Sequence, residues 1–318
     1  MSHDPDGRLL AGKAYREDAA VLRVPPGKAL VQSVDVLAPL VNDPSRFGAI
    51  AAANALSDIY AMGGEPWCAL NIAFFPTDCL DLKILRDMAQ GGLEKLREAG
   101  ALLVGGHTVD DAEIRCGFSV TGIVDADAIA ANDALRPGDI LLLTKPLGTG
   151  VLAAALKAKW DGWEESEEEL WRWCSRLNRG GARVIRELGL KAATDVTGFG
   201  LGGHLLEMAR ASGVSMRVEL DSLPLLPRAA EYAQNGLIPA ASHANRKYYR
   251  PWTRTRAPVD ETREILLFDA QSSGGLVLAA PADTLGRTEE LLAAQGEAFW
   301  RIGAVLPPHG EAGFLFVE

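Results

Sequence analysis

Cysteine is scarce in this sequence, and the few cysteines lie far apart. No pair has the C-x-x-C spacing of many zinc and redox sites, so we expect reduced thiols rather than a zinc site or a disulfide framework. The four are Cys68, Cys79, Cys116 and Cys174. The sequence also lacks an apolar run of about 18 residues, so we expect no membrane span. Its first residues, MSHDPDGR, lack the basic and then apolar pattern of a secretion signal, which predicts a cytoplasmic protein.

An excess of positive charge is missing as well. The 318 residues carry a formal net charge of −10, which argues against nucleic acid or a membrane surface as a partner. With 48% hydrophobic and 23% charged residues the chain is of the folded globular class, and its length favours two domains. Such an acidic protein can bind a phosphate ligand only if metal cations stand between its carboxylates and the phosphates.

Helical and strand-like stretches alternate along the chain, which favours an α/β or α+β fold. Residues 19–24 and 29–39, separated by the turn PPGK, predict a hairpin. A helix is predicted over 43–62, because Asp43 suits the N-cap, Pro44 suits the first helical position, and two glycines follow.

The turn Arg136-Pro137-Gly138, followed by a new apolar strand, is the best candidate for a domain boundary. We therefore expect an N-terminal α/β domain over 1–137 and a C-terminal α+β domain over 138–318. In the second half, the basic segment HANRKYYR (243–250) is expected to be a loop that reaches a surface or a ligand.

Of two glycine-rich matches to nucleotide-binding motifs, the first is treated as chance and the second as weak, its glycines being better explained by close backbone approach. GRLLAGKA (7–14) ends in alanine where a P-loop has Ser or Thr, and it follows no strand. GFGLGG (198–203) has the spacing of a dinucleotide fingerprint, but the preceding KAATDVT is too polar for a central parallel strand.

Four carboxylates stand among apolar neighbours: Asp18, Asp35, Asp58 and Asp195. Taken singly, Asp18 and Asp195 are explained well enough as capping or hydrogen-bonded acids. Asp58 is not, because it lies mid-helix among small apolar residues, on the same face as Asn54, and a buried unpaired carboxylate is costly. Together the four predict oxygen ligands for a hard cation of the Mg²⁺ type, which in turn indicates a nucleotide polyphosphate.

A further candidate is the segment LLVGGHTVD (102–110). Its two glycines after an apolar strand are expected to form a turn that exposes backbone N–H groups, with His107 and Thr108 as further donors. Taken alone, His107 is better explained as an ordinary hydrogen-bonded turn histidine.

Five segments in register resemble one family, selenophosphate synthetase (selenide, water dikinase), from about residue 9 to the C-terminus. They are NALSDIYAMGG, LLVGGHTVD, LLLTKPLGTGV, ATDVTGFGLGGHLLEMA and DAQSSGGLVLA. The resemblance implies an aminoimidazole ribonucleotide synthetase-like fold of two domains, α/β and α+β, and a homodimer whose N-terminal domains pair through a β-barrel. It also implies that ATP, selenide and water give selenophosphate, AMP and phosphate, with Mg²⁺ and K⁺. A selenium-delivery protein is a further expected partner.

Carried over by motif position, the resemblance implies two sets of site residues. The metal set is Asp18, Asp58 and Asp195. The ATP set is Tyr15, Arg16, Glu17, Asp35, Asn54, Asp58, Gly106, His107 and Thr108.

The family's N-terminal segment with a catalytic Cys or selenocysteine and a Lys has no match in MSHDPDG. We therefore expect that this chain contains no catalytic residue of that kind and is weak in turnover while still binding Mg-ATP. A truncation, a selenocysteine codon read as a stop, and a paralogue without the chemistry remain alternatives. Another ATP-using enzyme of the superfamily, such as thiamine-monophosphate kinase or a hydrogenase maturation protein, and a non-catalytic nucleotide-binding protein are the rival functions.

Overall fold

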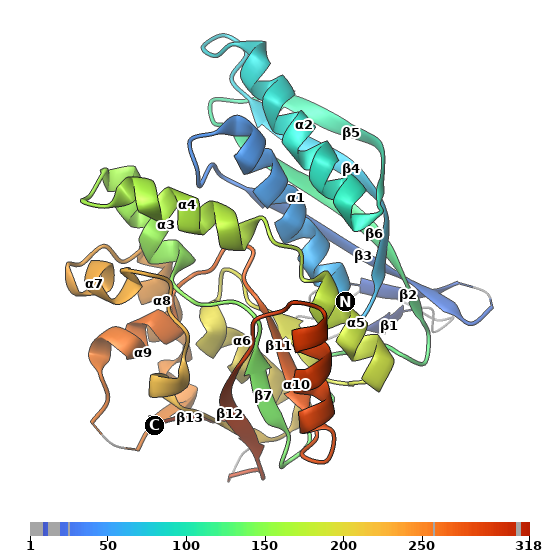
Figure 1. Ribbon diagram of the computed structural model, residues 1–318, viewed down its shortest axis with the longest axis vertical. Helices are drawn as coiled ribbons and strands as arrows, with labels where there is room; N and C mark the ends of the chain where they lie inside the picture. Colours follow the sequence, from blue (N-terminus) through green and yellow to red (C-terminus); the bar gives the residue numbers. More distant parts are fainter. Residues whose placement is uncertain (1–8, 12–19, 25, 257, 310–312) are drawn as a thin grey trace.

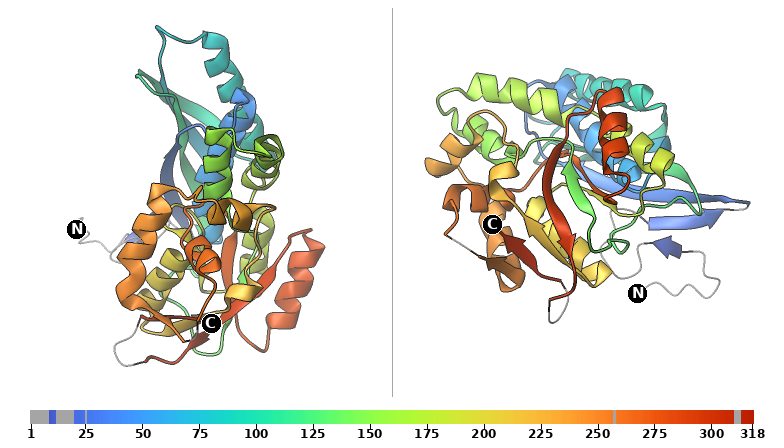
Figure 2. Two further views of the ribbon diagram at one scale, coloured as in Figure 1. Left: turned by 90° about the vertical axis from the view of Figure 1, so that its left-hand side faces the viewer. Right: turned by 60° about the horizontal axis from the view of Figure 1, so that its bottom comes forward.

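Two β-sheets with helices packed on them make up the computed structural model, which describes residues 9–11, 20–24, 26–256, 258–309 and 313–318. The sheets lie towards opposite ends of an elongated molecule (Figures 1 and 2). The first half comprises β1 (Leu9–Ala11), β2 (Ala20–Val24), β3 (Lys28–Leu37), α1 (Pro44–Ala61), β4 (Glu65–Phe75), α2 (Leu82–Ala99), β5 (Leu102–Asp110) and β6 (Arg115–Asp125).

The second half begins with β7 (Ile140–Leu143), so the predicted boundary after residue 137 falls in the connection between β6 and β7. Its other strands are β8 (Ala193–Asp195), β9 (Ser215–Val218), β10 (Thr253–Thr255), β11 (Leu276–Ala280), β12 (Trp300–Leu306) and β13 (Leu315–Val317). Its helices are α3 (Thr149–Ala158), α4 (Trp163–Cys174), α5 (Arg179–Leu188), α6 (Gly200–Ser212), α7 (Ala229–Gln234), α8 (Ala240–Tyr249), α9 (Glu261–Leu267) and α10 (Leu285–Ala294), with short 3₁₀ turns at Leu220–Ser222 and Arg250–Trp252.

The N-terminal sheet has the strand order β1-β2-β3-β6-β4-β5, and the predicted hairpin is β2–β3. Helices α1 and α2 cover one of its faces (Figure 1). The two helices touch backbone to backbone, because a Cβ added at Gly48 would lie 1.8 Å from the carbonyl oxygen of Met88, and one at Gly91 would lie 1.9 Å from that of Ser45. Glycine is therefore required at both positions of this contact.

Helix α1 begins and ends where its sequence predicts. The Asp43 side chain accepts a hydrogen bond from the backbone N–H of Arg46 at 2.8 Å, Pro44 is the first helical residue, and Gly63 follows with φ +73°. The helix is buried from Phe47 to Ala61, which is unusual for a helix that contains a carboxylate. It is buried because it also packs against α4, α5 and β8 of the second half, so α1 joins the two halves of the fold.

The C-terminal sheet has the order β10-β13-β9-β12-β7-β11-β8. Strand β8 lies at an edge and pairs antiparallel with β11, so GFGLGG follows no central parallel strand and the rejection of a dinucleotide fingerprint is confirmed.

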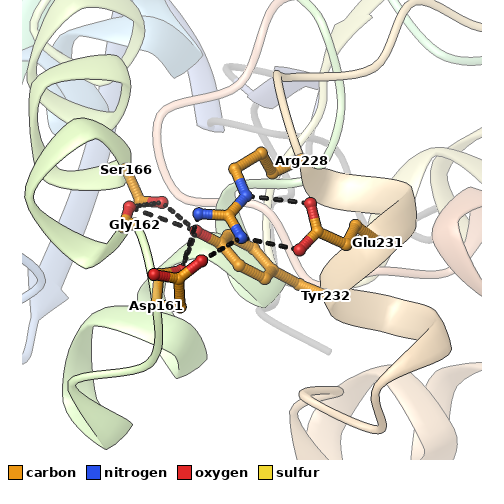
Figure 3. A network of polar contacts seen from close by, with 6 residues as sticks. All are labelled: Asp161, Gly162, Ser166, Arg228, Glu231 and Tyr232. Carbon is orange, nitrogen blue, oxygen red and sulfur yellow. Dashed lines mark hydrogen bonds and ion pairs between the residues drawn. The ribbon is translucent and has the colours of Figure 1, made fainter.

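In the same half, the hydroxyl of Tyr232 in α7 contacts Ser166 and the carbonyls of Asp161 and Gly162 at the start of α4 (Figure 3).

The prediction of a loop over 243–250 is wrong. Residues 243–249 lie within α8, Arg250 begins the 3₁₀ turn that follows, and the segment contains no glycine or proline. The helix is held by tertiary contacts, since Tyr249 is buried against Phe268 and donates a hydrogen bond to Glu207 at 3.0 Å. Among the described helices, none is long and apolar enough to cross a membrane.

Candidate functional site

Asp35, Asn54 and Asp58 are brought together where β3 packs against α1. The alternation of a strand turns Ser33 and Asp35 towards the helix, while Asn54 and Asp58 lie one turn apart on the facing side of α1. The amide Nδ2 of Asn54 donates to Oδ2 of Asp35 at 2.8 Å, and the hydroxyl of Ser33 donates to Asp58. The prediction that Asn54 and Asp58 project from the same face of the helix is consistent with these contacts.

Asp195 joins this group from the other half of the fold. It is the last residue of β8, it is 1% exposed, and β8 lies against α1. Burial, and then the negative charge of Asp195, raise the pKa of Asp35 to about 6, while the hydrogen bond from Asn54 opposes that rise. We call Asp35, Asp58 and Asp195 the acidic cluster. Asp35 and Asp195 lie close enough for their charges to repel, so a cation is the natural complement to this pair.

The donor set fits a hard cation, because it consists of carboxylate, amide and hydroxyl oxygens without thiol or imidazole. Within the stretches that the structure describes, no three acidic, histidine or cysteine side chains come close enough to hold a metal ion by themselves. Asp18, the third predicted ligand, lies outside the described residues, as do Tyr15, Arg16 and Glu17. The assignment of Mg²⁺ to Asp18, Asp58 and Asp195 therefore stays a prediction.

The expected glycine turn at 105–106 is wrong, because both glycines lie inside β5. Gly106 pairs with Asn71 of β4, and a Cβ added to it would lie 2.3 Å from the carbonyl oxygen of Asn71, so close strand packing alone requires glycine there. His107 and Thr108 follow on this edge strand and are exposed. Since β5 is three strands from β3, this segment lies about 14 Å from the acidic cluster's strand and is not brought beside it.

A loop that the sequence reasoning gave no role, residues 269–275, contacts Asn54, which in turn hydrogen-bonds to Asp35 of the acidic cluster. The backbone N–H of Ser273, which has φ +48°, donates to Oδ1 of Asn54 at 2.9 Å. Lys145, 2% exposed, donates from Nζ to the carbonyl oxygens of Ser273 at 2.9 Å and Arg176 at 2.7 Å. Burial lowers the pKa of Lys145 to about 8. Lys145 thus fixes the loop, the loop fixes Asn54, and Asn54 orients Asp35.

The same loop also fixes the start of α3. The side-chain oxygen of Gln271 accepts the backbone N–H of Gly148 at 3.0 Å and of Thr149 at 3.2 Å, and Asp269 accepts that of Gly150 at 3.1 Å. Burial raises the pKa of Asp269 to about 6. The signal for this loop was present in the sequence as polar residues inside the apolar segments DAQSSGGLVLA and LLLTKPLGTGV, but their partners lie more than 100 residues away.

Two protein-family models match the chain: AIR synthase related protein, N-terminal domain, over residues 16–124, and AIR synthase related protein, C-terminal domain, over 136–315. A curated relative, "Selenide, water dikinase" of Nitratidesulfovibrio vulgaris (strain DP4), is 57% identical over 298 residues, covering 94% of this chain and 85% of the relative.

Solved structures with the same architecture include thiamine-monophosphate kinase from Stenotrophomonas maltophilia K279a, with a TM-score of 0.69 at 21% identity over 99% of this chain and 92% of that one. Another is the hydrogenase maturation protein HypE in complex with ATP, with a TM-score of 0.67 at 20% identity over 95% of this chain and 84% of that one. At these identities the two structures bear on the fold alone, and with the domain matches they confirm the predicted fold class.

Proposed function

Because the chain belongs to the selenide, water dikinase family, we propose that it converts ATP, selenide and water to selenophosphate, AMP and phosphate. Besides the family membership, the observation that supports this proposal is that the acidic cluster and Asn54 come together at the junction of the two halves. Phosphoryl transfer requires mainly positioning and neutralisation of charge, which a set of carboxylates supplies through bound cations.

Asp18, Asp58 and Asp195 are the residues we propose to hold Mg²⁺. The oxygen-only donors and the repulsion that raises the pKa of Asp35 support this, because a cation would relieve that repulsion. When bound there, Mg²⁺ would neutralise negative charge on the phosphates during phosphoryl transfer. The K⁺ requirement that the family resemblance implies is carried as part of the proposal, without residues assigned to it.

The chain's own residues would prepare this site before ATP arrives. Asn54 is held at both ends of its amide, by the N–H of Ser273 and by Asp35, so Asp35 is presented in one orientation. The hydroxyl of Ser33 restrains Asp58 in the same way. Restraint of this kind lowers the entropic cost of placing a triphosphate among several carboxylates.

We propose Asp35, Asn54, Asp58 and the segment Tyr15–Glu17 as residues that contact ATP. Gly106, His107 and Thr108 complete the proposed ATP set from β5, where their exposure leaves them accessible to a ligand. If both groups contact one nucleotide, it must extend across the sheet, because β5 and β3 are three strands apart.

A homodimer that pairs through the N-terminal sheets is the proposed assembly. The face of this sheet away from α1 and α2 carries exposed apolar side chains on three strands, among them Val34 (60% exposed), Leu70 (45%) and Val104 (59%). Patches of this kind mark interaction surfaces. Light scattering with size-exclusion chromatography is expected to give twice the chain mass, and Val34→Glu is expected to reduce it to one chain. The control is Leu82→Glu, which changes an exposed leucine at the start of α2.

The identity of the adenosine product tests the reaction. With ATP, Mg²⁺ and selenide under anaerobic conditions, ³¹P NMR and nucleotide chromatography are expected to show AMP, phosphate and selenophosphate, whatever the rate. ADP as the sole nucleotide product would favour the thiamine-monophosphate kinase type of reaction instead. Failure to bind Mg-ATP at all would leave only a non-catalytic role.

A further inference from the structure

A basic stretch stands out in this acidic protein. Between Glu231 and Asp260 the sequence contains no Asp or Glu, while residues 246–256 contain four arginines and one lysine. The whole chain has a net charge of −10, so the charge of this stretch is opposite in sign to that of the protein as a whole. The stretch forms α8, the turn Arg250–Trp252 and β10.

The fold gathers three of these arginines around one cavity. Arg246, Arg250 and Arg254 line a cavity of about 370 Å³ together with Thr253, Thr255, Glu264 and Phe268. Arg246 and Arg250 are four residues apart at the end of α8, so they lie on the same side of the helix. We call this cavity the arginine pocket. It lies at β10, at the opposite edge of the C-terminal sheet from β8 and Asp195.

The pocket's positive charge is only partly neutralised. Glu264, 6% exposed, forms an ion pair with Arg246. Arg254 donates to two backbone carbonyls, of Pro251 at 2.8 Å and Thr253 at 3.1 Å, and lies over the ring of Phe314, so it is held in place without a carboxylate. Among the residues that the structure describes, none forms a hydrogen bond or ion pair with the side chain of Arg250. Three arginines and one glutamate leave two positive charges facing the cavity.

Arg228 serves as a comparison, because it is an arginine whose charge is neutralised by partners within the protein. Its guanidinium donates to both carboxylate oxygens of Glu231, at 2.9 and 2.6 Å, and to the carboxylate and carbonyl of Asp161 (Figure 3). All of its charge is thus matched within the protein. Arg250 and Arg254 have no such acidic partners, although they share one cavity and repel each other.

We propose that the arginine pocket binds a phosphate-class dianion, either free phosphate or the phosphoryl group of a small phosphomonoester. The planar guanidinium matches two phosphate oxygens at once, and two uncompensated positive charges match a dianion. A metal cation is excluded by the same charge. The cavity is larger than one phosphate needs, so it also admits the rest of a small ester. This site is independent of the proposed reaction and of the acidic cluster.

Isothermal titration of the full chain with inorganic phosphate, without Mg²⁺ or nucleotide and at constant ionic strength, tests the proposal. Saturable binding is expected, and Arg250→Gln and Arg254→Gln are each expected to weaken it at least about tenfold. The control is Arg287→Gln, which removes an exposed arginine paired with Glu187 and Glu290 on the far helix α10 and is expected to leave the affinity unchanged.

A parallel titration with glycerol 3-phosphate distinguishes the two sources of the dianion. Tighter binding of the ester than of inorganic phosphate identifies a phosphomonoester site, and equal or weaker binding identifies a site for the free ion. The proposal is overturned if the unmodified protein shows no saturable binding of either probe. It is also overturned if correctly folded Arg250→Gln, checked by circular dichroism, binds as the unmodified protein does.

Discussion

His204 makes the stability of the protein depend on pH in a calculable way. The ring lies in α6, 5% exposed, and its Nε2 accepts the backbone N–H of Thr197 at 3.1 Å, in the loop that follows Asp195. Burial lowers the pKa of His204 from 6.5 to about 4. Between the two pKa values His204 is protonated in the unfolded chain but neutral in the folded protein. The free energy of unfolding therefore decreases as pH falls below about 6.5.

The size of this effect follows from the two pKa values. Between about pH 8 and about pH 5.5 the difference in proton binding lowers the free energy of unfolding by about 1.4 kcal/mol. Below about pH 4 the total loss reaches about 3 kcal/mol, because the folded protein then also takes up the proton. In His204→Gln the amide oxygen can accept the same N–H, but it does not titrate.

Urea unfolding of both proteins at these two pH values is the assay. The stability advantage of the unmodified protein over His204→Gln should shrink by about 1.4 kcal/mol from about pH 8 to about pH 5.5, while contributions from other titrating groups cancel in the comparison. If the difference between the two proteins is the same at both pH values, His204 does not titrate in this way and the burial argument is wrong.

Three further changes follow from packing and hydrogen bonds. Gly91→Ala should lower the free energy of unfolding by about 3 kcal/mol, because its Cβ would lie 1.9 Å from a backbone oxygen of α1. Gly286→Ala, with open space around the glycine, should not lower it, and equal effects of the two changes in urea unfolding would refute this. Tyr232→Phe should lower it by about 1–2 kcal/mol, because the hydroxyl has three partners within 3.1 Å, and an unchanged urea midpoint would contradict that. Lys145→Met should lower the free energy of unfolding by about 3 kcal/mol, because two carbonyls lose their donor. It should also weaken Mg-ATP binding, because the loop at Ser273 is released from Lys145. Unchanged nucleotide affinity in a calorimetric titration would show that this loop does not position Asn54.

The sequence was informative wherever a local rule decided the outcome. Helix α1 is predicted because its cap, its first proline and its terminal glycines act within a few residues of the chain. Asp58 stood out because a mid-helix carboxylate among alanines has no local explanation, and the structure gives it a hydrogen bond from Ser33 of β3.

The failures have a common cause in contacts between distant parts of the chain. A turn was expected at Gly105 and Gly106, yet pairing with β4 continues the strand through both glycines. Segment 243–250 was expected to be a loop, yet burial of Tyr249 between α6 and α9 stabilises a helix. Nothing local in the sequence indicates that Lys145, Ser273 and Asn54 are neighbours, because more than 90 residues separate each from the next.

The central claim is that Asp58 belongs to a metal–nucleotide site, and calorimetric titration with a non-hydrolysable ATP analogue tests it most directly. Asp58→Asn can still accept the hydrogen bond from Ser33, so the fold should be retained. The account predicts Mg²⁺-dependent binding to the unmodified protein, a loss of at least about 100-fold in Asp58→Asn, and no change in Asp221→Asn, where the carboxylate is fully exposed. Retained affinity in Asp58→Asn, or binding that is the same without Mg²⁺, would contradict it.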